Sequence, residues 1–402
     1  MTNISIHSIA KEYDGTRVLD NVSFDVGSGE ILALLGASGS GKSTTLRLIA
    51  GLEELTEGQI SFGDQLVSAP GFRIPANRRN LGYVFQNYAL WPHLSVLNNV
   101  AYPLRARGLR RRDAKRKAGE ALELVKLTGL ADRRIGQLSG GQQQRIGLAR
   151  AVVAEPSVIL FDEPLSNLDT QLRFELRREI KRLHEILGFT AVYVTHDYTE
   201  ALSLSDRIAV FRSGRIEQID TAEGLFDQPA NEFVGRFFGF DNFIPAVVTG
   251  EEDAGHVRIS LAGATTTDTA DGSSSAAAVS AVLPTATPVQ IGSEVTVATR
   301  SSNVAALPIG ESAAPTVRAR VLDLDFAGAN YIAHVQLGDV VVRASLPRSV
   351  WGGHAAERIR EYNSVVDVRF DWQPARLILA PSQTTGRRGN LTPADLIEAG
   401  TQ

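Results

Sequence analysis

A short segment rich in glycine and serine limits what this chain can fold into more than any other feature of its sequence. It reads Gly36-Ala37-Ser38-Gly39-Ser40-Gly41-Lys42-Ser43-Thr44. It matches the pattern G-x-x-x-x-G-K-[ST], and it lies between an apolar run typical of a buried strand and a stretch typical of a helix. Glycines let backbone N–H groups turn inward around a phosphate, and a helix N-terminus adds partial positive charge. The segment therefore predicts a phosphate-binding loop in which Lys42 contacts the β- and γ-phosphates and Ser43 binds Mg²⁺.

A second apolar run supplies the acidic partner that such a loop requires. Residues 158–161 are apolar enough for a parallel strand buried on both faces, and Asp162 and Glu163 follow directly. Open α/β sheets bind their ligands at the carboxyl ends of the strands. We therefore expect Asp162 to hold Mg²⁺ and Glu163 to act as the general base that polarises the attacking water.

The composition is that of a globular protein with more than one domain. The chain has 402 residues, of which 43% are hydrophobic and 21% charged, and this is enough apolar material for a full core. There is no cysteine, which excludes disulfide bonds and thiolate metal sites. Residues 1–10 lack the features of a secretion signal, and no apolar run approaches the length of a membrane span. We expect a chain that neither crosses a membrane nor is exported.

The pattern of strand-like and helix-like runs in the sequence changes near residue 240, which predicts two domains. In residues 1–239, strand-like and helix-like runs alternate, as in an α/β domain. Residues 240–381 are rich in short β-type runs separated by Gly, Pro and polar residues, which favours a small all-β barrel. These runs are 256–261, 294–299, 317–324, 331–337, 340–346 and 365–370. We also expect a flexible Ala/Ser/Thr-rich insertion at about 263–286 and a polar tail at 382–402, in which 393–399 has the pattern of a short helix.

A further motif lies between the phosphate loop and the acidic strand. It reads Leu138-Ser139-Gly140-Gly141-Gln142-Gln143-Gln144-Arg145. Taken alone, a serine followed by two glycines is either a plain helix N-cap or a second anion-binding nest. Beside the phosphate loop, however, the run resembles the LSGGQ signature motif of the ATP-binding subunits of ATP-binding cassette (ABC) transporters. The resemblance implies that ATP is contacted by Ser139, Gly140, Gly141 and Gln142.

Other motifs of the ABC family follow in the expected order. Tyr13 resembles the aromatic residue that stacks on adenine, and Gln86 resembles the Q-loop glutamine that joins Mg²⁺ to the membrane-facing surface. Asp169 resembles the D-loop aspartate at the dimer contact, and His196 resembles the switch histidine that senses the γ-phosphate. Each residue would mean little alone, but together with the two loops they extend the resemblance over about residues 3–238.

The resemblance implies an ATP hydrolase with an α/β phosphate-loop (P-loop) nucleotide-binding domain that carries a helical subdomain. In the family, two subunits pair head to tail, and each ATP is bound by the phosphate loop of one subunit and by the signature residues of the other. A homodimer is therefore implied, with ATP and Mg²⁺ as cofactors. The implied Mg²⁺ ligands are Ser43, Gln86 and Asp162, and the implied catalytic residues are Glu163, His196 and Gln86.

The β-rich domain resembles the TOBE-type regulatory barrel of importer ATPases, whose topology is similar to that of oligonucleotide-binding (OB) folds. Residues 240–402 carry 12 basic and 17 acidic side chains, which argues against nucleic acid as a partner. The resemblance implies a peripheral protein on the cytoplasmic face of the inner membrane. Its implied partners are integral-membrane permease subunits and, indirectly, a solute-binding protein. Stretches such as 193–219 and 237–243 look most like the ferric-iron branch, with polyamine and phosphonate importers as alternatives.

A soluble ABC ATPase without a transport role is the alternative from another class. An ATPase of DNA repair or chromosome structure needs a long coiled coil between Thr44 and Leu138, but only 93 residues without heptads separate them. A translation factor of the family needs two cassettes, and this chain has one phosphate loop. A binding module without catalysis is disfavoured because Glu163 and His196 are both present. We therefore predict the ATPase subunit of an importer.

Overall fold

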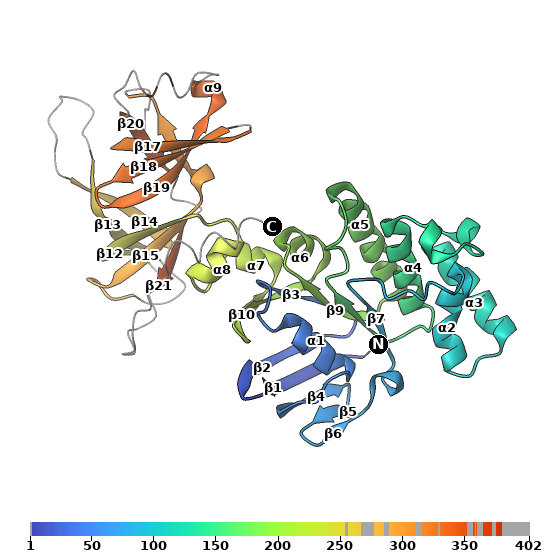
Figure 1. The fold of residues 1–402 in the computed structure, drawn as a ribbon. Helices are drawn as coiled ribbons and strands as arrows, with labels where there is room; N and C mark the ends of the chain where they lie inside the picture. The colour runs from blue at the N-terminus through green and yellow to red at the C-terminus, as the bar shows by residue number, and fades with distance from the viewer. Residues whose placement is uncertain are drawn as a thin grey trace. The chain divides into compact units, whose positions relative to one another are not determined.

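The computed structural model describes residues 2–253, 256–266, 277–284, 289–309, 316–328, 330–351, 357, 359, 365–371 and 375–379. The chain divides into two compact units, Met1–Glu223 and Gly224–Gln402 (Figure 1). We call them the N-terminal unit and the C-terminal unit.

Two β-sheets form the framework of the N-terminal unit. The antiparallel sheet has the order β2 (Thr16–Val26), β1 (Ile4–Tyr13), β4 (Glu57–Phe62), β5 (Gln65–Ala69) and β6 (Phe72–Arg73). The second sheet has the order β11 (Arg215–Asp220), β10 (Arg207–Arg212), β3 (Ile31–Leu35), β9 (Thr190–Thr195), β8 (Val158–Asp162) and β7 (Leu81–Val84). From β10 to β7 all neighbours in this second sheet are parallel, and β11 pairs antiparallel with β10. The carboxyl ends of β3, β8 and β9 therefore meet at one edge.

Helices connect these strands and follow local capping signals. They are α1 (Lys42–Ala50), α2 (Val96–Ala106), α3 (Arg111–Leu124), α4 (Gly140–Val152), α5 (Thr170–Leu187) and α6 (Tyr198–Leu204), with 3₁₀ turns at Ala76–Arg78, Thr128–Leu130 and Ile135–Gln137. Ser95 begins α2 by accepting a hydrogen bond from the Asn98 amide, and Gly188 ends α5 with a φ of 65°. Helices α2, α3 and α4 contact one another and gather at one end of the unit (Figure 1). They form the helical subdomain that the sequence implied.

The parallel sheet is buried on both faces. On β8, Val158 and Leu160 belong to the core shared with α1 and the antiparallel sheet. Ile159 and Phe161 point to the opposite face, where they pack in the core shared with the helical subdomain and α5. All four side chains are fully buried. This two-sided burial explains why the run before Asp162 is continuously apolar rather than alternating.

Among the described residues, the C-terminal unit contains a five-stranded antiparallel sheet and a closed five-stranded barrel. The sheet has the order β14 (Ala277–Pro284), β13 (His256–Thr266), β12 (Asn242–Asp253), β15 (Glu294–Thr299) and β21 (Arg376–Leu379). The barrel has the order β16 (Val304–Leu307), β19 (Val340–Pro347), β18 (Asn330–Leu337), β17 (Val317–Ala327) and β20 (Val365–Phe370). Short helical segments are α8 (Glu232–Phe237), α9 (Arg348–Trp351) and the 3₁₀ turn Ser301–Asn303, and α7 (Ala222–Asp227) crosses from one unit into the other.

This architecture confirms the predicted fold class. The N-terminal unit is an α/β phosphate-loop domain with a helical subdomain, and the C-terminal unit contains a closed β-barrel of the size of an OB-like domain. The six β-type runs identified in the sequence lie in β13, β15, β17, β18, β19 and β20. Two of them, 294–299 and 365–370, coincide with the strands at both ends.

The segment 263–286 differs from the flexible insertion that its composition predicted. Strand β13 continues to Thr266, and β14 pairs antiparallel with it, with Val257 opposite Leu283. Leu283 is fully buried in the core of the C-terminal unit, so the end of this stretch contributes to that core. Residues 267–276 and the predicted tail 382–402, including 393–399, lie outside the described residues.

The boundary between the compact units lies earlier in the chain than the change in sequence pattern at residue 240. Arg300, which follows β15, explains the difference. Its guanidinium donates hydrogen bonds to the carbonyl oxygens of Phe226 and Phe238, at 2.7 and 3.2 Å. It also lies over the rings of Phe226 and Phe240. Residues 224–240 thus pack in the C-terminal unit. The change in sequence pattern at residue 240 marks instead where helix-like runs give way to strand-like runs.

Candidate functional site

The loop between β3 and α1 is shaped by close packing at two glycines. A Cβ atom at Gly36 would lie 2.5 Å from the carbonyl oxygen of Phe211 on β10. Gly41 has a φ of 104°, and a Cβ atom there would lie 2.5 Å from the Leu19 side chain. Glycine is therefore required at both positions. Lys42 begins α1 directly after Gly41, so the free N–H groups of the first helical turn lie at this loop.

Lys42 is a buried cation held by the loop itself. Its side chain is almost inaccessible, with 3% of the residue exposed. Nζ donates hydrogen bonds to the carbonyl oxygens of Gly36 and Ala37, both at 2.8 Å, and to Ser40 Oγ at 3.4 Å. Burial lowers the pKa of Lys42, and the negative charges of Glu163 and Asp162 oppose that shift. The ammonium group is thereby fixed where a phosphate-binding loop needs positive charge.

Ser43 and Asp162 meet across the edge of the sheet. Ser43 Oγ donates a hydrogen bond to Asp162 Oδ1 at 2.9 Å. Ser43 lies in the first turn of α1, and Asp162 is the last residue of β8. A hydroxyl and a carboxylate oxygen at this separation are the hard oxygen donors that Mg²⁺ prefers, so the two residues fit a Mg²⁺ site.

Glu163 and His196 form the second pair at this edge. Glu163 Oε2 lies 3.3 Å from His196 Nδ1. The hydrogen bond to His196 lowers the pKa of Glu163 even though burial acts against this, and the same bond raises the pKa of His196. Glu163 also has a φ of 43°, a left-handed conformation that is uncommon for a residue with a side chain and that accumulates at functional sites.

The turn that carries His196 is fixed from both sides. Asp197 caps α6 by accepting hydrogen bonds from the amides of Thr199 and Glu200, at 2.7 and 3.3 Å. The buried Glu200 carboxylate accepts hydrogen bonds from the Tyr193 and Thr195 hydroxyls of β9. Since β9 ends at Thr195, these bonds join the strand to the helix and present the histidine between them.

Gln86 is linked to Glu163 through Ser166 of the D-loop. Gln86 Nε2 donates to Ser166 Oγ at 3.3 Å, and Ser166 Oγ donates to the carbonyl oxygen of Glu163 at 3.0 Å. Asp169 is exposed and caps α5, because its Oδ1 accepts from the Leu172 amide at 3.0 Å. The catalytic role implied for Gln86 stays a prediction. Its predicted role as a Mg²⁺ ligand stays a prediction.

The signature residues begin α4 through a capping box. The amide of Ser139 donates to Gln142 Oε1, and the amide of Gln142 donates to Ser139 Oγ. Gly141 is buried against Leu172 of α5, where a Cβ atom would lie 2.6 Å from a leucine methyl. Ser139 and Gly140 are exposed. The plain N-cap considered from the sequence is therefore present, and it leaves the N-terminus of α4 accessible.

Tyr13, the last residue of β1, is 40% exposed. Its hydroxyl is hydrogen-bonded to the Glu53 carboxylate, and the Lys11 ammonium lies 4.7 Å from the ring centroid. These contacts hold an aromatic ring at the surface, as stacking on a nucleobase requires.

Three further residues of the N-terminal unit were not recognised in the sequence. Tyr83 on β7 donates a hydrogen bond from its hydroxyl to Asp162 Oδ2 at 2.8 Å. Burial raises the pKa of Tyr83 well above its ordinary value, and the Asp162 charge adds to the shift. Arg79 and Arg150 are buried arginines that bind backbone carbonyl groups. No motif marks these residues, since each depends on a partner distant in the sequence.

Arg79 lies at the C-terminal end of α1. Its guanidinium donates to the carbonyl oxygens of Leu48 and Ile49, at 3.1 and 2.6 Å, within that helix. It also donates to the carbonyl oxygens of Ile74 and Val67 and to Ser68 Oγ. Only 3% of the residue is exposed, and burial lowers its pKa to about 10.

Arg150 lies in α4 and holds the segment that follows Gln86. It donates hydrogen bonds to the carbonyl oxygens of Tyr88 and Ala89, at 2.7 and 2.6 Å. Its guanidinium also lies 5.1 Å from the ring centroid of Trp91. Tyr88 and Ala89 have φ values of 59° and 46°, so two consecutive residues with side chains adopt the left-handed conformation.

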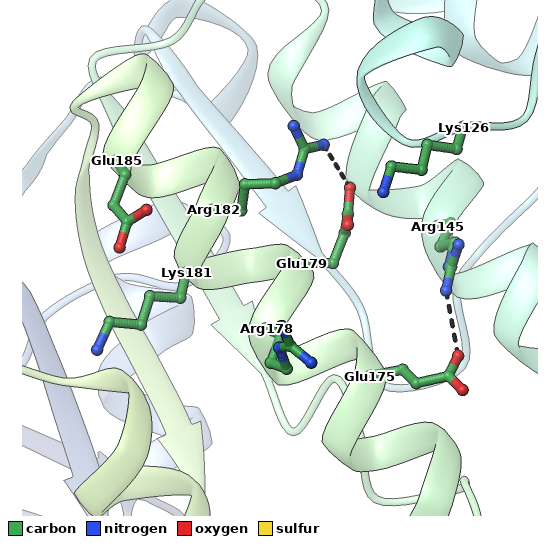
Figure 2. Close-up of a pocket in the computed structure, with 8 residues that line it drawn as sticks. All are labelled: Lys126, Arg145, Glu175, Arg178, Glu179, Lys181, Arg182 and Glu185. Carbon is green, nitrogen blue, oxygen red and sulfur yellow. Dashed lines mark hydrogen bonds and ion pairs between the residues drawn. The ribbon is translucent and has the colours of Figure 1, made fainter.

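A cavity of about 510 Å³ lies on the surface formed by α5, by Arg145 of α4 and by Lys126 after α3 (Figure 2). Its lining is charged, and much of that charge is paired. Arg145 binds Glu175 at 3.4 Å, and Arg182 binds Glu179 at 2.6 Å. None of its lining residues belongs to the phosphate loop, to β8 or to the His196 turn.

Within the described part of the chain, no helix has the length and apolarity needed to span a membrane.

A family model described as "ABC transporter" matches residues 19–166. The Fe(3+) ions import ATP-binding protein FbpC of Rhizobium etli is 47% identical to this chain over 249 residues, which are 62% of this chain and 69% of that protein. The trehalose/maltose import ATP-binding protein MalK of Thermococcus litoralis is 45% identical over 267 residues, 65% of this chain and 72% of that protein. The sulfoquinovosyl glycerol transport ATP-binding protein SmoE of Agrobacterium fabrum is 44% identical over 253 residues, which are 62% of this chain and 70% of that protein.

Proposed function

This chain belongs to the ABC transporter family as an ATP-hydrolysing subunit of the import type, and from that premise we propose how its residues bind ATP and drive uptake of a solute. One observation carries the proposal. A buried ammonium, a Ser43–Asp162 pair and a Glu163–His196 pair converge at the carboxyl edge of β3, β8 and β9.

In the proposed complex, the phosphates of ATP lie in the loop 36–44 and the adenine stacks on Tyr13. Lys42 exchanges its bonds to the loop carbonyl groups for bonds to the β- and γ-phosphates, which are stronger because both partners are charged. The N–H groups at the start of α1 donate to the same phosphates. The exposed face of Tyr13 supplies the stacking surface.

Ser43 and Asp162 hold Mg²⁺, with Gln86 as the third proposed ligand. When bound, Mg²⁺ neutralises charge on the phosphates. Glu163 accepts a proton from the attacking water, and its lowered pKa keeps it ionised and ready to do so. His196, hydrogen-bonded to Glu163, donates toward the γ-phosphate. Ser166 links Gln86 to Glu163 and so couples the Q-loop to the base.

We further propose a homodimer in which Ser139, Gly140, Gly141 and Gln142 of one subunit contact the ATP bound by the other. The exposure of Ser139, Gly140 and Asp169 supports this, since a second copy can reach these residues. The backbone N–H groups at the N-terminus of α4 suit a phosphate of the partner's nucleotide.

The proposed partners are integral-membrane permease subunits on the cytoplasmic face of the inner membrane and, indirectly, a solute-binding protein. Ferric iron is the proposed solute, supported by the Rhizobium etli relative, and polyamine and phosphonate are the alternatives. Relatives named for trehalose/maltose and sulfoquinovosyl glycerol are nearly as similar, so uptake of radiolabelled iron, spermidine and maltose by a deletion strain is the deciding measurement. Loss of iron uptake alone supports the proposal, and loss of sugar uptake alone overturns it.

The substitution Glu163→Gln tests the proposed chemistry. It preserves the shape of the side chain but removes its basicity, so we expect ATP hydrolysis to fall by roughly 10²- to 10⁴-fold. ATP binding should persist, and a dimer should accumulate with ATP in size-exclusion chromatography. Glu175→Gln on α5 is the matched control, because Glu175 is half-exposed and pairs only with Arg145 among the contacts described above. Normal turnover by the Glu163 variant would exclude it as the base.

A further inference from the structure

The carboxylate of Asp162 receives a hydroxyl group on each of its two oxygens. Ser43 donates to Oδ1 at 2.9 Å, and Tyr83 donates to Oδ2 at 2.8 Å. The two donors come from different elements, since Ser43 lies on α1 and Tyr83 lies on the neighbouring strand β7. The carboxylate is therefore held at both ends.

The position of Tyr83 is itself well determined. It pairs with Leu160 in the register between β7 and β8, two residues before Asp162. Its ring packs against the ring of Phe85, with centroids 4.3 Å apart. A strand position and a ring contact together fix where the phenol oxygen lies, and a phenol hydroxyl remains a donor at neutral pH.

We propose that Tyr83 is a positioning residue for the divalent cation, which fixes the Asp162 carboxylate so that Oδ1 stays directed toward Ser43. The inference rests on the proposed function, because it concerns the Mg²⁺ site described there. The phenol occupies Oδ2 and hinders rotation of the carboxylate about its last bond. Oδ1 and the Ser43 hydroxyl then remain adjacent as the pair of oxygen donors.

A partner of this kind acts on a metal through its ligand. Residues that hydrogen-bond a metal ligand change metal affinity by about 10- to 100-fold when they are removed. They do not touch the nucleotide, so binding of ATP in the absence of a divalent cation should not depend on them. This contrast separates a positioning role from a general effect on the fold.

The test is Tyr83→Phe, which removes one oxygen and leaves the ring to pack on Phe85. Mn²⁺ binding to the ADP-loaded full-length chain, followed by electron paramagnetic resonance, should weaken by about 10-fold or more. The affinity for ADP in EDTA should stay within twofold of the wild type. A Mn²⁺ affinity within twofold of the wild type would overturn the inference, as would an equal loss of ADP affinity in EDTA.

Two controls make the outcome specific. Tyr198→Phe removes a hydroxyl from a half-exposed tyrosine at the start of α6 and should leave Mn²⁺ binding unchanged. In an Asp162→Asn background, Tyr83→Phe should have no additional effect on Mn²⁺ affinity, because the phenol acts through that carboxylate. Additive losses would contradict the inference. If wild-type protein loaded with ADP binds no Mn²⁺, the proposed Mg²⁺ site fails, and this result differs from every outcome for the variant.

Discussion

The two ends of helix α1 each carry a buried cation, but in opposite circumstances. Lys42 lies at the N-terminus, where the helix dipole already contributes positive charge, and Arg79 lies at the C-terminus, where the dipole is negative. Both residues are 3% exposed. The arginine donates to carbonyl groups in the last turn of the helix, where the dipole favours a cation, whereas the lysine adds positive charge where the helix is already positive.

This difference separates a structural cation from a functional one. Arg79 donates to four carbonyl oxygens and a hydroxyl, and the helix dipole favours it. Lys42 donates to three oxygens of the loop that surrounds it, and its pKa is lowered by burial. A buried charge at the unfavourable end of a helix is expected where an anion is to bind, since the anion supplies the missing partner.

The largest expected effect is on stability, at the C-terminal end. Arg79→Met removes five hydrogen bonds from a largely buried site, and we expect the free energy of unfolding to fall by about 3–5 kcal/mol. Urea denaturation followed by circular dichroism measures the change. Arg47→Met, in the last turn of the same helix, is the control, because that side chain is half-exposed and should alter stability by less than about 0.5 kcal/mol. Equal effects of the two variants would remove the structural role assigned to Arg79.

The second expected effect is on ligand binding, at the N-terminal end. Lys42→Met should lower the affinity for ATP by about 100-fold or more, because charge-assisted bonds to two phosphates are lost. The free energy of unfolding should fall by less than for Arg79→Met, since Lys42 makes three hydrogen bonds rather than five and one of its acceptors belongs to the exposed Ala37. Isothermal titration calorimetry and urea denaturation give the two values. If the Lys42 variant keeps its ATP affinity but loses stability, Lys42 is a structural cation like Arg79, and the contrast between the two residues is wrong.

The smallest expected effect concerns the pair beside Lys42. The pKa of His196 is raised above its ordinary 6.5, so its contribution to stability is complete below pH 6.5 and is lost as the pH rises through the raised value. The pKa of Glu163 is lowered below its ordinary 4.5, so its contribution is complete above pH 4.5 and is lost as the pH falls through the lowered value. The pair therefore stabilises the fold most between about pH 4.5 and 6.5.

Solvent screening keeps this effect under about 1 kcal/mol, because the His196 side chain is 44% exposed. Urea denaturation at pH 5.5 and at pH 8.5 should show His196→Gln destabilised relative to the wild type at the lower pH only. A difference of the same size at both pH values would show that the pair does not titrate as described.

Sequence motifs predicted the N-terminal unit well because its chemistry is local. The phosphate loop requires glycines at fixed spacing, and the apolar run before Asp162 reflects a strand buried on both faces. Arg79 and Tyr83 were missed for the opposite reason. Arg79 binds carbonyl groups of Leu48 and Val67, and Tyr83 binds a carboxylate 79 residues later in the chain. Nothing near either residue in the sequence reveals such partners.

The C-terminal unit shows where composition is a poor guide. Its barrel strands were predicted from short β-type runs separated by Gly, Pro and polar residues. The Ala/Ser-rich segment before Leu283 contains strand β14, which composition assigned to an insertion, and the burial of Leu283 in the core is a tertiary contact that composition does not reveal. Contacts of Arg300 assign residues 224–240 to this unit, and the alternation of strand-like and helix-like runs in the sequence does not reveal such packing.

The hydrogen bonds that Arg150 donates to the segment after Gln86 have an energetic consequence. Two consecutive left-handed residues, Tyr88 and Ala89, cost about 1–2 kcal/mol each relative to ordinary backbone. Backbone hydrogen bonds of the segment itself and the Arg150 side chain of the signature helix together hold this conformation. If α4 moves so far that these bonds to Arg150 break, relaxation of the two residues lowers the free energy of the segment. Displacement of the signature helix is therefore energetically coupled to a change of shape between Gln86 and Trp91.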